Sequence, residues 1–396
     1  MPSYKFFILM AATILLPGLF SNCGGVGPET EGEQAAVRDL EKIQWGEIGG
    51  MPVYLYTLSN GGLVAKVTNY GTNLTELHVP DHNGQTADVV LGLDTLDEYV
   101  THRPFLGCIL GRVANRVAKG SFSLDGKDHT LTTNWGSHHL HGGNEGFNRK
   151  VWTVTHQEQT DDHASLTMTY TSPDGEEGYP GNLETSVTYR LSNRELHLEI
   201  VAQTDVPTIV NLSNHTYWNL AGHGSGDILG HRLRVDADHY TPGDADGVPT
   251  GEIRAVAHTP FDFTQPKPIG KEVERIPQRN AEDPGGYDVN FVLNGEPGET
   301  RPIARVVEPL SGRALEVCST QPGVQLYTGN HLNGSLQGKG SMPYEKHAGF
   351  CLESQHYPDS INKEGKPGWP SVILRPGESY RHVVVFKFST VVPESL

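Results

Sequence analysis

Apolar and polar residues alternate with a period of two along most of the chain from about residue 43 onward. The clearest alternating stretches lie at 164–170, 183–191, 195–201 and 380–388. Successive side chains of a strand point to opposite faces, so this pattern predicts strands with one buried face. A Ser-Asn-Arg connection at 192–194 predicts a hairpin between the second and third stretches. Helical periodicity is never sustained over a dozen residues, and only 93–100 is expected to form a turn or two of helix.

Turn signals separate the alternating stretches. Asn-Gly occurs at 60–61 and 83–84, and Asp-Gly at 125–126. The chain has 46 Gly and 26 Pro among 396 residues, which favours many turns and few long helices. We therefore predict an all-β protein, a large sandwich or barrel, with one domain over 43–392.

The charge balance excludes some partners. Lys and Arg number 30 against 47 Asp and Glu, a formal net charge of −17. Such acidity argues against binding to nucleic acid or to an anionic membrane surface. It leaves neutral small molecules open as ligands.

The first residues predict export. Residues 1–22 contain Lys5, the apolar run FFILMAATILL and a Pro-Gly break, which is too short for a membrane span and typical of a secretory signal. Cys23 follows, as at a bacterial lipoprotein cleavage site, where the cysteine becomes the lipidated first residue, although Phe20 and Asn22 are bulkier than usual there. Residues 23–42 have little apolar content and are expected to be a flexible tether. We predict a periplasmic protein or a lipoprotein anchored to a membrane through Cys23.

Three further cysteines remain, Cys108, Cys318 and Cys351. Three cysteines cannot all pair, and no CxxC occurs, so neither a disulfide framework nor a zinc knuckle is indicated. They are expected to be buried small apolar residues.

The stretch NLSNHTYWNLAG at 211–222 surrounds His215 with amides and aromatic rings. Asparagine is depleted in strands because its side chain competes for backbone hydrogen bonds. Amides beside aromatics suit a ligand that is polar at its edges and apolar on its faces, as a sugar ring is. The alternative is a loop whose Asn side chains satisfy local backbone groups, with His215 merely adjacent.

Glu353 interrupts the apolar run Phe350-Cys351-Leu352. It is either an edge residue in solvent or a buried group with the raised pKa that a general base needs. His215 has the complementary property, because a histidine gives or takes a proton near neutral pH. A carboxylate base and an imidazole acid indicate proton transfer on a neutral substrate.

Other chemistries lack their motifs. In HHLH (138–141), His139 and His141 would share a strand face, but no carboxylate follows at ligand spacing, so no metal site is predicted. There is no phosphate loop and no GxSxG nucleophile elbow. No cofactor is expected.

Six motifs then appear in a fixed order: GRVANR, LHGG, NLSNHTYWNLAG, GYDVNF, TQPGVQLYTGN and GFCLESQ. In these motifs the sequence resembles the aldose 1-epimerase, or galactose mutarotase, family, from about Gln44 to Phe388. The resemblance implies a large antiparallel β-sandwich and the interconversion of α and β anomers of free aldoses such as galactose and glucose. The substrate would be a small aldose, and neither the preferred aldose nor the oligomeric state follows from the motifs.

The resemblance also implies roles for single residues. His215 would be the general acid and Glu353 the general base. The other positions that match substrate-binding residues of the family are Asn115, Arg116, His141, Tyr217, Asp288 and Gln325.

Two alternatives stay open. A hexose-6-phosphate 1-epimerase would need a cluster of arginines, and only Arg112 and Arg116 lie near the motifs. A non-catalytic exported sugar-binding protein would have no need of the acid/base pair His215 and Glu353.

Overall fold

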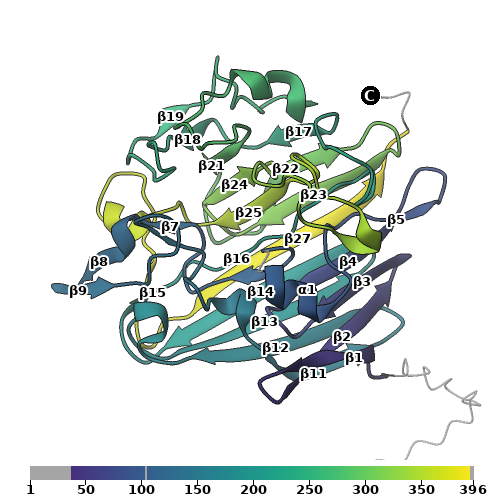
Figure 1. Ribbon diagram of the computed structural model, residues 1–396, viewed down its shortest axis with the longest axis horizontal. Helices are drawn as coiled ribbons and strands as arrows, with labels where there is room; N and C mark the ends of the chain where they lie inside the picture. The colour runs from purple at the N-terminus through teal and green to yellow at the C-terminus, as the bar shows by residue number, and fades with distance from the viewer. Residues whose placement is uncertain (1–36, 103–104, 393–396) are drawn as a thin grey trace, which may run out of the picture. The chain divides into compact units, whose positions relative to one another are not determined.

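The structure is a computed structural model that describes residues 37–102 and 105–392 (Figure 1). The predicted signal segment, Cys23 and the predicted tether up to residue 36 lie outside the described residues. Arg38 pairs with Gln159, and strand β1 begins at Glu41. Paired backbone therefore starts a few residues before the expected domain boundary at residue 43.

The largest sheet has nine antiparallel strands in the order β11-β12-β13-β14-β27-β23-β22-β17-β20. The strands are Thr153–Gln159 (β11), Ala164–Ser172 (β12), Leu183–Ser192 (β13), Glu195–Thr204 (β14), Tyr380–Thr390 (β27), Arg313–Ser319 (β23), Arg301–Val307 (β22), Arg232–Val235 (β17) and Lys267–Pro268 (β20). All four stretches with clear alternation lie in this sheet, so those strand predictions are confirmed. The C-terminal strand β27 lies in the middle and joins the strands of the two chain halves (Figure 1).

Two five-stranded sheets complete the core. One has the order β1-β2-β3-β4-β5 and the other β19-β18-β21-β24-β25. The first consists of Glu41–Ile48 (β1), Met51–Asn60 (β2), Leu63–Thr68 (β3), Leu74–Pro80 (β4) and Thr86–Asp88 (β5). The second consists of Arg254–Ala255 (β19), His239–Thr241 (β18), Asp288–Val292 (β21), Gly323–Tyr327 (β24) and Cys351–Gln355 (β25).

One apolar core is shared by all three sheets. It joins Leu198 and Phe386 of the nine-stranded sheet with Leu77 of β4 and with Phe291 and Leu352 of the second five-stranded sheet. Along β13 and β14 buried residues alternate with more exposed ones, as expected for strands that cover a core with one face. The all-β, antiparallel sandwich prediction is confirmed.

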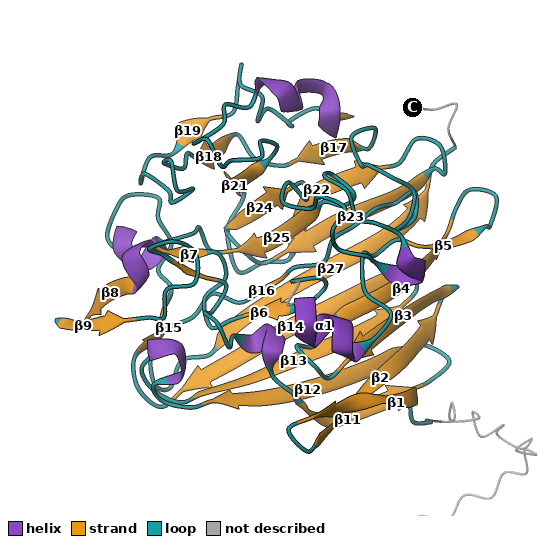
Figure 2. Cartoon of the chain, in the orientation of Figure 1, coloured by secondary structure: helices purple, strands orange, loops and turns teal. Residues whose placement is uncertain are grey.

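Four short pairs of strands and several short helices fill the connections (Figure 2). The pairs are Ile109–Leu110 (β6) with Ser213–Asn214 (β16), Arg116–Val117 (β7) with His139–Leu140 (β10), Ser121–Leu124 (β8) with Lys127–Thr130 (β9), and Thr208–Ile209 (β15) with Ile373–Leu374 (β26). The 3-10 turns are Ala118–Gly120, Phe147–Arg149, Glu176–Gly178, Ile269–Arg275, Lys339–Ser341 and Ser360–Lys363. Helix α1 spans Leu96–His102, which confirms the short helix expected near 93–100.

Local signals in the sequence explain the turns. The Asn-Gly and Asp-Gly pairs fall between β2 and β3, β4 and β5, and β8 and β9. The β13–β14 hairpin turns at Asn193 and Arg194, whose φ angles of 47° and 65° match a turn that needs two positive φ values. Helix α1 begins with a capping box, in which Thr95 and Glu98 bond each other's backbone N–H groups.

The prediction for the three remaining cysteines is confirmed. Cys108, Cys318 and Cys351 are free and buried, as expected. Among the described residues, no helix has the length and apolar character needed to cross a membrane.

Lys339 links the segment before β25 to the first five-stranded sheet through hydrogen bonds and an ion pair. Its ammonium group is buried, with the residue 7% exposed, and donates hydrogen bonds to the carbonyls of Thr75 (2.7 Å) and Val90 (2.8 Å) and to the carboxylate of Asp88. Burial lowers the pKa of Lys339, and the charge of Asp88 works in the opposite direction. The ion pair therefore holds two parts of the fold together at a site that is largely shielded from solvent.

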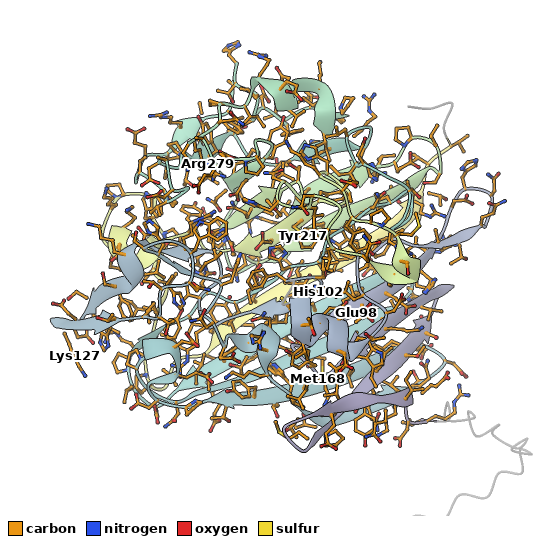
Figure 3. The ribbon with its side chains drawn as sticks, in the orientation of Figure 1. Glu98, His102, Lys127, Met168, Tyr217 and Arg279 are labelled. Carbon is orange, nitrogen blue, oxygen red and sulfur yellow. The ribbon has the colours of Figure 1, made fainter. Side chains whose placement is uncertain are left out.

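We predict that Lys339→Met lowers the free energy of unfolding by about 3–5 kcal/mol, because it leaves the carboxylate of Asp88 buried without its cation. Urea unfolding followed by fluorescence measures this loss. The exposed Lys127, at the edge of the molecule in Figure 3, is the matched control. Lys127→Met should change stability by less than about 0.5 kcal/mol. Equal losses of unfolding free energy in the two variants would contradict the role assigned to the ion pair of Lys339 and Asp88.

Candidate active site

His215 and Glu353 come from segments 138 residues apart and face one another. Glu353 is the central residue of β25 and pairs with Gln325 of β24, while His215 directly follows β16. The His215 Nε2 and Glu353 Oε1 atoms lie 3.7 Å apart, and the two side chains are 4% and 2% exposed. The structure therefore joins the acid and the base that the sequence predicted, and it buries both.

Side-chain to backbone hydrogen bonds hold these two segments together. Ser213 Oγ donates to the carbonyl of Ser354 over 2.9 Å. The amide of Asn211 donates to the carbonyl of His356 (3.1 Å) and accepts from its N–H (2.9 Å). These bonds fix the relative position of the strand that carries Glu353 and the chain that carries His215.

The other polar residues of 211–222 also serve the fold. Asn214 donates to the carbonyl of Gly107, and Asn219 donates to the carbonyls of Gly226 and Ala348. Trp218 packs against Phe386 and Phe388 in the core. The expectation that the amides and Trp218 surround a sugar is therefore wrong. The asparagines bond backbone groups, and Trp218 packs against rings of the core.

Aromatic rings enclose the two histidines of the site. The ring of Phe105 lies 4.8 Å from that of His141 and 5.9 Å from that of His215, centroid to centroid. Tyr217 lies 4.9 Å from His215 on another side and Tyr327 lies 6.3 Å away. Tyr217 is thus at the site as predicted, whereas Phe105 was missed because it lies in none of the six motifs.

Burial shifts the pKa values of the pair in opposite directions. Burial lowers the pKa of His215 to about 4. Burial, together with the neighbouring His215, also lowers the pKa of His141. It raises the pKa of Glu353 well above its usual range, and the negative charge of Asp288 adds to this while Arg116 opposes it. Burial therefore disfavours both charged forms, the Glu353 carboxylate and the His215 imidazolium.

Asp288 of β21 is the centre of a charged network beside this pair. Its Oδ2 accepts from Arg116 Nη2 (3.2 Å) and Arg279 Nη1 (3.1 Å), and its Oδ1 accepts from Gln325 Nε2 (2.6 Å). Burial alone would raise the pKa of Asp288, but the charges of the two arginines and the bond from Gln325 outweigh it and hold the pKa far below its usual range. Asp288 is therefore a permanent anion. Three of the residues were predicted for the site, and Arg279, from a loop without a motif, was missed.

His141 and Asn115 hold each other in an unusual backbone conformation. The φ angles are 61° at Asn115 and 51° at His141, a region that residues other than glycine rarely occupy. The Asn115 N–H donates to His141 Nδ1 (3.1 Å), so a neutral His141 carries its proton on Nε2. Asn115 Oδ1 accepts from the Arg116 N–H (3.0 Å) and from Arg116 Nη1 (3.1 Å), which orients that side chain.

The glycine after His141 explains why LHGG and GRVANR occur together. Gly142 has a φ of +88°, and a Cβ placed there would lie 1.7 Å from the carbonyl oxygen of Gly111. Only glycine therefore allows the two loops to approach closely enough to bring His141 beside Asn115.

Three site residues also have the composition of a metal site. The ligand atoms of His141, His215 and Glu353 all lie within 4.8 Å of one another and could hold a divalent cation. The carboxylate comes from a distant strand, so sequence spacing in HHLH did not show it. His139 is not part of this group, because its ring nitrogens bond the carbonyl of Thr132 and the hydroxyl of Tyr179.

Of the two arginines in GRVANR, only Arg116 faces the site. The guanidinium of Arg112 is buried and donates to the hydroxyl of Ser172 and to four carbonyl groups. The charges of Arg116 and Arg279 are offset by Asp288 and by Asp283, which accepts from Arg279 Nε (2.8 Å). These cations are therefore already paired, which disfavours a hexose phosphate as the ligand.

Comparisons with known proteins agree with the motifs. The sequence matches the family model for aldose 1-epimerase over residues 54–387. A galactose mutarotase of Bos taurus is 44% identical over 86% of this chain and 96% of its own length. An aldose 1-epimerase of Escherichia coli strain K12 is 35% identical over 86% and 96%. The crystal structure of an aldose epimerase homologue from C. elegans superimposes with a TM-score of 0.76 at 32% identity and covers 85% of this chain and 99% of that one.

We predict that His215 stays neutral until the pH falls to about 4, because its ring is buried. NMR of histidine-labelled protein should show a midpoint near that value for the signal that is lost in His215→Gln. The unfolded chain takes up this proton near pH 6.5, so the contribution to stability falls as the pH is lowered from about 6.5 to 4.

Phe105→Ala tests whether burial causes the low pKa of His215. It removes one of the rings around His215 and admits water, so it should raise the titration midpoint of His215 toward pH 6.5. A wild-type midpoint at or above pH 6 would show that burial does not control this group.

Proposed function

The chain belongs to the aldose 1-epimerase family and is an isomerase of that class, and we propose that Glu353 and His215 interconvert the anomers of its aldose substrate by general base and general acid catalysis. The observation that carries this proposal is the buried carboxyl of Glu353 facing the buried imidazole of His215 at 3.7 Å. Curated relatives carry the names galactose mutarotase and aldose 1-epimerase, which supports free aldoses such as galactose and glucose as substrates.

The proposed reaction moves two protons and breaks one ring bond. Glu353 removes the proton of the C1 hydroxyl while His215 protonates the ring oxygen O5. The C1–O5 bond then breaks, its electron pair stays on O5, and C1 becomes an aldehyde. Rotation about C1–C2 presents the other face of the carbonyl, and ring closure by the reverse transfers gives the other anomer.

The reaction requires a carboxylate and an imidazolium, whereas burial disfavours both of these charged forms in the free site. The charged pair and the neutral pair differ only in the position of one proton. Hydroxyl groups of a bound sugar would donate to Glu353, whose Oε2 has no hydrogen-bond partner among the described residues. Hydrogen bonds to a carboxylate favour its ionised form, so substrate binding would move the proton toward His215.

The remaining predicted residues would bind and orient the sugar. Arg116 and His141 would stabilise negative charge on sugar oxygens through charge-assisted bonds. Asp288 and the Oε1 of Gln325, which has no partner among the described residues, would accept from ring hydroxyls, with Asn115 orienting Arg116. The ring of Tyr217 would form an apolar wall beside His215.

We predict that Glu353→Gln slows enzymatic mutarotation at least about 100-fold, because a positioned base contributes roughly 10²–10⁴ in rate and an amide cannot take the proton. Polarimetry of freshly dissolved α-glucose and α-galactose measures the rate. Sugar affinity, measured by calorimetry, should change only a few-fold because the amide keeps the size of the side chain.

Glu184→Gln, an exposed change on β13, is the matched control and should have the wild-type rate. Dialysis of the wild-type protein against EDTA should also leave the rate unchanged, because the proposed transfers use only side chains. A Glu353→Gln rate within a few-fold of wild type would refute the assignment of the base.

We further propose that the protein is exported and that Cys23 carries a lipid. The support is the order of features in residues 1–23: one lysine, an apolar run, a Pro-Gly break and then cysteine. Two signals are generally needed for stable anchoring, and two acyl chains supply them at about 0.8 kcal/mol for each buried CH₂. These residues lie outside the part of the chain that the structure describes.

Mass spectrometry of the N-terminus of the native protein should find Cys23 as the first residue, with a thioether-linked diacylglycerol. An intact Met1 in a soluble cytoplasmic fraction would disprove export. Cleavage that leaves an unmodified thiol or a different first residue would disprove only the lipid.

A further inference from the structure

One tryptophan at the rim of the site is exposed. Trp135 lies in the turn before β10 and is 38% exposed, whereas Trp152 and Trp218 are each 1% exposed and lie in the core. Its ring makes an edge contact with the ring of His331 at 5.5 Å, centroid to centroid. The guanidinium carbon of Arg116 lies 6.0 Å from the centroid of the Trp135 ring. A large flat apolar surface therefore lies open to solvent directly beside a residue assigned to sugar binding.

The Trp135 ring lines a cavity of about 340 Å³. The other lining residues include His331, Arg116, Arg279, Glu282 and Asp283. The volume is within the range of roughly 300–1,000 Å³ that is usual for small-molecule sites. Aromatic faces combined with carboxylates and a guanidinium provide the contacts that a neutral sugar ring needs.

The position of the cavity relative to Glu353 and His215 indicates which end of a bound sugar would face the cavity. The rings that contact His215 are those of Phe105, Tyr217 and Tyr327, so its surroundings do not include Trp135. Arg116 connects the two regions, because it bonds Asp288 inside the site and faces Trp135 outside it. A sugar whose C1 lies at Glu353 and whose hydroxyls bond Arg116 and Asp288 would therefore direct its opposite end, near C4, toward the cavity.

Anomer exchange needs only one free C1 hydroxyl. A disaccharide linked at the C4 oxygen has that hydroxyl on its reducing-end ring, and the second ring projects from the opposite side. The chemistry of the proposed function is therefore compatible with a substrate that extends out of the site into the cavity.

We propose that this cavity is an outer sugar subsite, in which Trp135 stacks against the second ring of a 4-linked disaccharide and makes the enzyme prefer it to a free hexose. The proposal rests on the proposed function, because it assumes that the reducing-end ring is at Glu353 and His215. Trp135 is then a specificity-determining residue that contacts only the ring that does not react. Apolar contact with the faces of a sugar ring supplies binding energy remote from the reacting bond.

The test compares two substrates in the full-length protein. Mutarotation of freshly dissolved α-lactose and of α-glucose is followed by polarimetry in wild type and in Trp135→Ala. We expect the wild-type kcat/KM to be higher for lactose than for glucose. Trp135→Ala should lower the lactose value at least ten-fold and change the glucose value less than two-fold. Trp135→Phe keeps a flat ring and should retain most of the lactose activity.

Binding is measured separately with methyl β-lactoside and methyl β-glucoside, which cannot open their rings. Trp135→Ala and the polar variant Trp135→Gln should both weaken the lactoside at least ten-fold and leave the glucoside within two-fold. Leu310→Ala removes another exposed apolar side chain, 86% exposed and distant in sequence, and should change neither.

Three results would overturn the subsite. They are equal losses for both substrates, an unchanged lactose rate in Trp135→Ala, and a wild-type enzyme that uses glucose at least as well as lactose. A wild-type protein that accelerates neither sugar would instead overturn the proposed function, so the two failures are distinguishable.

Discussion

Removal of water from Glu353 is the constraint on which the site depends. A carboxyl group in the centre of a core strand is costly to ionise, and its pKa rises for that reason. The same enclosure, made by Phe105, Tyr217 and the sheet, keeps His215 neutral. Burial thus disfavours the charged form of both groups. A solvent-exposed carboxyl and imidazole at the same separation would have pKa values near the ordinary ones.

Burial keeps the pKa values of Glu353 and His215 shifted only if the two groups stay in place. Hydrogen bonds between the segments that carry them fix their positions. His382 Nδ1 donates to the carbonyl of Leu212 (3.1 Å), and Nε2 of the neutral ring accepts from Ser354 Oγ (2.8 Å). One buried ring therefore contacts both the segment of the base and the segment of the acid. His382 belongs to β27, so with the bonds of Ser213 and Asn211 it ties the two segments of the site to each other and to the nine-stranded sheet.

Paired charges lie beside Glu353 and His215. Asp288 is ionised because two arginines contact it, and those arginines are in turn neutralised by Asp288 and Asp283. A neutral ligand with many hydroxyls can exchange hydrogen bonds with such a network without adding charge. A phosphate would have to displace a carboxylate that is already well bound. The open face of Trp135 lies where the network reaches solvent.

Local patterns in the sequence determined the strands, the turns and the short helix, because alternation, Asn-Gly pairs and the capping box act over a few residues. The family motifs also predicted His215, Glu353, Arg116 and Asp288 as site residues, and these lie together in the structure. Tertiary structure alone decided which polar residues face this site: Arg112 and Arg116 share one motif, yet the first is enclosed by carbonyls and the second bonds Asp288. Phe105, Arg279 and Trp135 reach the site through loops, whose course depends on long-range packing that no local pattern encodes.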